Sequence, residues 1–169
     1  MTRWILLGAA LALGGCAAKP CEPVVLDSHA QRLLQENDLM QARLLVTSGP
    51  QSSLELADAL LARIADQDPR GEVALYQAVS LIRQRAALER ILPLLERSAE
   101  RRHPHALALL YKIYNEPFLA PQADRARALR YRQAYAELDV AKGGGYPSFP
   151  RALMVVDQLV NPPARVRGQ

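Results

Sequence analysis

Residues 72–115 read EVALYQAVSLIRQRAALERILPLLERSAERRHPHALALLYKIYN, and this stretch decides the fold of the chain. Its apolar residues recur every three or four positions, the period at which an α-helix turns one face toward a core. The stretch predicts three consecutive helices, at about residues 72–85, 87–101 and 104–115. Pro93 lies inside the second helix and is expected to kink it or to mark its true start.

Helical periodicity continues on both sides of this stretch. Further helices are expected at about residues 28–46, 52–67, 121–142 and 150–160. The patterns Ser28-x-x-Gln31 and Ser52-x-x-Glu55 fit the capping box that opens a helix, and Pro121 is expected in the first turn of its helix. No strand-like alternation is found, so the predicted class is all-α.

Similar proline-containing turns follow three of the expected helices. Pro69 and Pro104 are 35 residues apart, and Pro147 follows after another 43. Spacings in this range are typical of paired-helix repeats, in which each helical hairpin buries its apolar face on the next one. The sequence therefore predicts a small solenoid.

One stretch resembles the Sel-like repeat, a loop-containing relative of the tetratricopeptide repeat. The matching residues lie on a first helix, a loop and a second helix: Ala106, Leu110 and Tyr114, then Pro121, Gln122 and Asp124, then Tyr131 and Ala134. The preceding hairpin matches only loosely, around Ala74, Ala78 and Ile82. The family has glycines where this chain has Tyr111, Pro117 and Leu119.

The resemblance implies a short paired-helix superhelical array of about six to seven helices over residues 27–160. In such an array small alanines let the paired helices approach, and tyrosines fill the space between them. An ordinary helical bundle is the alternative.

The first fifteen residues have the layout of a secretory signal peptide. Arg3 precedes an apolar run from Trp4 to Leu13, and Gly14 and Gly15 follow it. The run is shorter than the about 20 apolar residues that span a bilayer, so a permanent transmembrane helix is not expected.

The tetrapeptide Leu13-Gly14-Gly15-Cys16 resembles the bacterial lipobox. The resemblance implies cleavage after residue 15 and lipid on Cys16; an ordinary signal peptide with a chance cysteine is the alternative. Ala17 stands where aspartate usually signals retention in the inner membrane, so we expect an outer-membrane anchor that faces the periplasm. Residues 16–26 form the expected tether and residues 161–169 an expected disordered tail. With Cys16 lipidated, Cys21 has no intrachain disulfide partner.

Catalytic and ligand motifs are missing from the sequence. The three histidines, His29, His103 and His105, have no cysteine or carboxylate at ligand spacing. In Lys142-Gly143-Gly144-Gly145 no serine or threonine follows the lysine, so a helix end explains it better than a phosphate loop. We expect no enzymatic activity, cofactor, metal or small-molecule substrate. Export argues against nucleic-acid binding.

Tyrosines are the remaining candidates for a binding site. Tyr76, Tyr111 and Tyr114 lie on the first helices of the two best-marked hairpins, which line the concave side of related arrays. Aromatic rings there anchor protein partners, so at least one of the three rings is expected to be only partly buried. The alternative is that all of them fill the core.

The sequence thus favours a lipid-anchored adaptor that binds another envelope protein during cell-envelope assembly or export. The alternative is a periplasmic inhibitor or immunity-type protein that binds one toxin or hydrolase.

Replacing the lipobox cysteine tests the anchor. The Cys16→Ser variant is expected to lose acylation and membrane retention, because no other residue accepts the lipid. Mass spectrometry of the mature N-terminus measures this. An unmodified cysteine in the wild-type protein, or cleavage elsewhere, contradicts the prediction.

Overall fold

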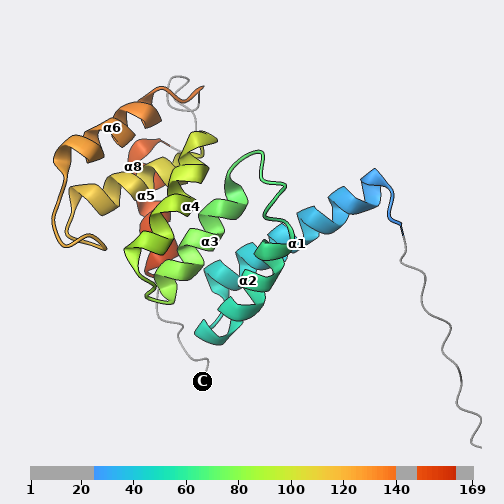
Figure 1. Cartoon of the computed structure of the whole chain (residues 1–169). Coiled ribbons are helices and arrows are strands. Elements are labelled where there is room, and N and C mark those ends of the chain that lie inside the picture. Colours follow the sequence, from blue (N-terminus) through green and yellow to red (C-terminus); the bar gives the residue numbers. More distant parts are fainter. Residues whose placement is uncertain (1–24, 140–147, 163–169) are drawn as a thin grey trace, which may run out of the picture.

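The computed structural model describes residues 25–139 and 148–162 of the chain. These residues form seven α-helices and one short 3-10 helix, and no strand is found among them (Figure 1). The helices are α1 (Ser28–Ser48), η1 (Gln51–Ser53), α2 (Leu54–Arg63), α3 (Glu72–Arg83), α4 (Leu88–Glu100), α5 (Pro104–Asn115), α6 (Arg125–Ala136) and α8 (Phe149–Val160). The predicted all-α class and the number of helices are confirmed.

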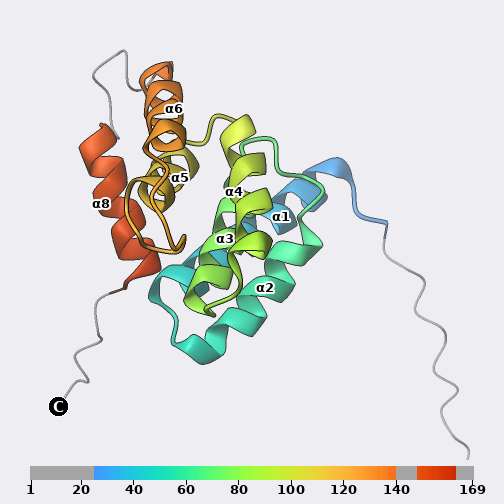
Figure 2. The ribbon, with the colours of Figure 1, turned by 60° about the vertical axis from the view of Figure 1, so that its left-hand side comes forward.

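Consecutive helices pack in pairs. The most extensive contacts join α1 with α2, α3 with α4, and α5 with α6, so the chain forms three helical hairpins. The hairpins follow one another across the molecule, and α8 packs against α5 and α3 (Figure 2). The hairpin organisation expected from the proline spacing is therefore present.

The core is centred on helices α3 and α5. Most positions of α3 and α5 are buried, including the fully buried Ala74, Ala78, Ala106 and Ala108, which let neighbouring helices approach closely. Larger fully buried residues, among them Leu75, Leu109, Leu110 and Ile113, fill the remaining space. Helix α4 continues through Pro93, whose ring is on the exposed side.

Both predicted capping boxes are wrong, for local reasons. Asp27, one residue earlier than predicted, caps α1, and its carboxylate accepts a hydrogen bond of 2.7 Å from the amide of Ala30. Ser53 precedes α2 but caps nothing, because its hydroxyl donates to the carbonyl groups of Pro50 and Leu45. A turn of 3-10 helix therefore comes before α2.

Helix α6 starts later than predicted. Pro121 lies in the loop, and Asp124 is the N-cap, with its carboxylate 2.9 Å from the amide of Arg127. The backbone amide of Asp124 also donates to the carbonyl of Tyr114 on α5, which fixes the start of α6 against its partner helix. Helix α6 ends at Ala136 with Glu137 as its C-cap, which is earlier than the predicted end at about residue 142.

Several predicted features lie outside the described residues. They are the signal peptide with Cys16, Cys21 and most of the tether, the stretch from Lys142 to Pro147, and most of the C-terminal tail. Within the described residues, no helix is long and apolar enough to cross a membrane.

An ion pair between a buried aspartate and an exposed arginine joins the two helices of the first hairpin. Asp38 of α1 is 5 % exposed, and the Nε atom of Arg63 on α2 donates to its carboxylate at 3.0 Å. A buried carboxylate without such a partner is strongly destabilising, so this pair fixes how α1 lies on α2.

The second hairpin closes at Gly71, the residue before α3. Its φ of 70° lies in the left-handed region that favours glycine, and an added Cβ would come within 2.8 Å of the backbone of Ser98. The hydroxyl of the fully buried Ser98, on α4, donates to the carbonyl of Gly71 at 2.6 Å. The end of α4 is thereby held against the start of α3.

Substitutions at this contact should therefore destabilise the domain. We expect Gly71→Ala to lower the free energy of unfolding by about 3 kcal/mol, through strain and overlap, and Ser98→Ala by about 1–2 kcal/mol. Gln67→Ala, an exposed substitution in the same loop, is the control and should change less than about 0.5 kcal/mol. Urea unfolding measures all three, and equal effects of Gly71→Ala and Gln67→Ala would contradict the assignment.

Candidate protein-binding groove

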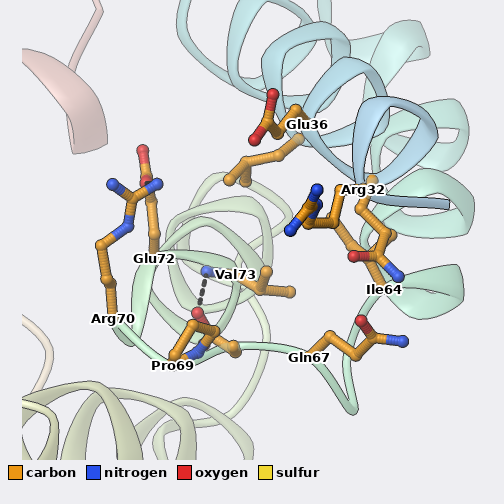
Figure 3. A pocket seen from close by; sticks show the side chains of 11 residues that line it. Arg32, Glu36, Ile64, Gln67, Pro69, Arg70, Glu72 and Val73 are labelled. Carbon is orange, nitrogen blue, oxygen red and sulfur yellow. Dashed lines mark hydrogen bonds and ion pairs between the residues drawn. The ribbon is translucent and has the colours of Figure 1, made fainter. Parts of the chain in front are cut away.

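Two adjacent hollows lie over the starts of α3 and α5. The first, of about 430 Å³, lies between α1 and the loop that leads into α3 (Figure 3). The second, also about 430 Å³, lies between α1, the start of α3 and the α4–α5 turn. They share Pro69, Arg70 and Glu72, and we call the two together the groove.

The shared rim is fixed by a helix cap. The carboxylate of Asp68 accepts a hydrogen bond from the amide of Val73, at 3.0 Å (Figure 3). It also accepts one from the amide of Ala74, at 2.9 Å, so two donors at the start of α3 are satisfied. Pro69 and Arg70 follow Asp68 and are exposed. The sequence of this turn therefore places Arg70 at the junction of the two hollows.

The groove carries more positive than negative charge. Five arginines line it, Arg32, Arg43, Arg70, Arg101 and Arg102, against three acidic residues, Glu36, Asp68 and Glu72. Glu72 pairs with Arg43 at 3.0 Å and lies 3.7 Å from Arg70. Among the described residues, Arg32 and Arg101 have no ion-pair partner, so the surface favours an anionic ligand.

Two histidines with lowered pKa values lie at the second hollow. The ring centroids of His103 and His105 are 5.6 Å apart. Burial, and then the neighbouring His105, lower the pKa of His103 to about 4, while burial and then Arg43 lower the pKa of His105. Both rings are therefore neutral at pH 7. His103 Nδ1 and His105 Nε2 are buried without a hydrogen-bond partner among the described residues.

Tyr76 is the one predicted groove tyrosine that the structure places there. Its ring is 7 % exposed, and the guanidinium of Arg43 lies 5.6 Å from its centroid. Burial raises the pKa of its hydroxyl. Tyr76 thus forms part of the floor beneath the arginines.

The other two predicted tyrosines pack elsewhere. Tyr111 is partly buried, as expected for at least one of the three rings, but its ring packs edge-on against Phe149 of α8 at 5.1 Å. Tyr114, 5 % exposed, stacks on Tyr131 of α6 at 5.8 Å, and Arg127 donates to its hydroxyl at 2.9 Å. The three rings therefore face α1, α8 and α6 and do not form one surface.

The arginines and histidines of the groove were missed as site residues. Arg70 lies in the turn that contains Pro69, and Arg101 and His103 in the turn that contains Pro104, both of which we interpreted only as helix ends. Because successive hairpins lie side by side, equivalent turns come together in space. The sequence signal that could have revealed this site is the basic and polar composition that the two turns share.

The side chains of the groove are suited to binding an anionic or carbonyl group. Its lining residues include no serine, threonine or cysteine, and among the described residues no group of three or more histidines, cysteines or carboxylates is placed to hold a metal. The guanidinium groups of arginine and the N–H groups of neutral imidazoles donate hydrogen bonds to carboxylate and carbonyl oxygens.

No protein-family model, curated protein or solved structure matches the chain. The interpretation of the groove consequently rests on its own geometry.

A buried neutral histidine predicts a dependence of stability on pH. Because the pKa of His103 is lowered in the folded state to about 4, the unfolded chain binds more protons between this value and its ordinary pKa, and stability falls as the pH falls. Between pH 7 and pH 5 we expect a loss of about 1–2 kcal/mol from this group. Thermal unfolding across this range measures the loss.

The variant His103→Gln should flatten this pH dependence, whereas His29→Gln, at an exposed position on α1, should leave it unchanged. The same slope in wild type and in His103→Gln contradicts the assignment.

Proposed function

We propose that the protein is an outer-membrane lipoprotein that faces the periplasm and binds an acidic segment of another envelope protein in its groove. It acts as an adaptor in cell-envelope assembly or export. The observation that carries the proposal is a set of arginines around Tyr76 and two neutral histidines. Most of these arginines come from the two turns that connect one hairpin to the next.

The composition of the groove supports a protein ligand. Arginine and tyrosine are enriched at protein interfaces and lysine is depleted, and the groove has five arginines and no lysine. The planar guanidinium group binds a carboxylate with two parallel hydrogen bonds, which gives direction as well as attraction. Asp and Glu side chains of a partner segment fit this lining.

The proposed anchor keeps the groove near the membrane. Residues 17–27 separate Cys16 from α1, and even fully extended they reach at most about 40 Å. A lipid on Cys16 therefore confines the groove to a shell within reach of membrane-embedded partners.

Charge reversal at the junction of the two hollows tests the binding site. Arg70 and Arg101 are exposed, so Arg70→Glu with Arg101→Glu should leave the fold intact and weaken capture of the partner by about tenfold or more, the equivalent of about 1.4 kcal/mol or more. The matched control reverses two exposed arginines away from the groove, Arg90 on α4 and Arg130 on α6. Quantitative mass spectrometry of proteins captured from envelope extracts measures the effect, and melting temperatures verify the fold.

Two outcomes contradict the proposal. If both double variants capture the partner equally well, the groove is not the binding site. If the partner is a toxin or hydrolase that loses activity on binding, the protein is an inhibitor and the adaptor role is wrong.

A further inference from the structure

Helix α1 has an apolar face that no other described residue of the domain covers. Leu33, Met40 and Leu44 are 52 %, 56 % and 59 % exposed, and their spacing places them within about 40° of one another around the helix. The buried residue Ala42 is on the opposite side, where α1 packs on its own hairpin. The first half of α1 also projects beyond α2 (Figure 1).

The exposed face follows a heptad pattern. Alternating spacings of three and four residues relate Ala30, Leu33, Asn37, Met40, Leu44 and Thr47. A stripe restricted to such positions is the narrow seam of a two-stranded coiled coil, narrower than the face that packs into a globular core.

The seam is complementary to itself when two copies run antiparallel. With Leu33 opposite Leu44 of the second copy, Asn37 meets Met40 and Ala30 meets Thr47, so every layer is paired. The flanking residues Glu36 and Arg43, which also line the groove, then face each other twice along one edge of the pair. The side chain of Arg43 is 51 % exposed beside its ion pair with Glu72. A parallel pair has no such charge complement, because Gln41 would face Glu36.

We propose that a second copy of this chain binds along α1 and forms an antiparallel two-helix interface. Antiparallel pairing places the projecting half of each α1 against the half of the other that carries its domain, so the two domains lie at opposite ends. The interface uses the face of α1 that points away from the hairpin, and it does not depend on the proposed ligand of the groove.

The polar flanks of the seam fit a helix partner better than a lipid surface. Helix α1 contains no lysine, and Glu36 and Gln41 border the seam. Helices that lie on membranes usually have a polar face rich in lysine and arginine. The seam is short, so pairing is concentration-dependent, and anchoring on a common membrane raises the effective concentration of the copies.

The oligomeric state of the full chain tests the proposal. In excess detergent, sedimentation should give the mass of two copies, and Leu33→Lys with Met40→Lys should raise the dissociation constant at least tenfold while the melting temperature holds. Leu56→Lys on α2 and Leu129→Lys on α6 are the matched controls, since these leucines are 56 % and 52 % exposed. Both controls should remain dimeric.

Cross-linking tests the direction of the two helices. In a Cys21→Ser background, Leu33→Cys and Leu44→Cys chains with different tags should form a mixed disulfide when combined. A wild-type monomer at all concentrations, a Leu33–Leu33 link in place of the mixed one, or loss of vesicle binding by the lysine variant without a change of mass overturns the proposal.

Discussion

The burial of α3 and of α5 among their neighbouring helices is the constraint on which the rest of the structure depends. Each of these helices is buried on most of its surface, against its hairpin partner on one side and neighbouring helices on the other. Only alanines at the closest approaches, and glycine at position 71, allow this density. With both helices enclosed, the turns before them carry exposed residues, and the groove forms there.

How far the sequence predicts the fold depends on how local the signal is. Helix α5 begins and ends where periodicity and Pro104 predicted, because buried apolar residues and an N-terminal proline agree over its whole length. The start of α1 was predicted correctly, but its N-cap and the starts of α2 and α6 were misplaced, because Asp27, Ser53 and Asp124 compete with nearby residues for backbone groups. Such competition is decided by geometry that residue type alone does not reveal.

The site was predicted less well than the fold, since it depends on which residues become neighbours. Tyr114 and Tyr76 are similar in sequence context, yet Arg127 and Tyr131 enclose the first, while the second lies beneath Arg43 at the groove. Arg70 and His103 are 33 positions apart and come together because their hairpins are adjacent. The spacing of the proline-containing turns predicts that these residues become neighbours, but only if the turns are themselves examined as a candidate binding surface.

The Asp38–Arg63 pair has a mechanical consequence. It is the first buried contact along α1, a rod of about 30 Å whose preceding half projects from the domain. A pull on the N-terminal end of α1 acts along the axis of this rod and reaches the pair before the apolar contacts behind it. The load is then a shear along the α1–α2 hairpin, in which several contacts resist together, and not a peeling force that breaks them one by one.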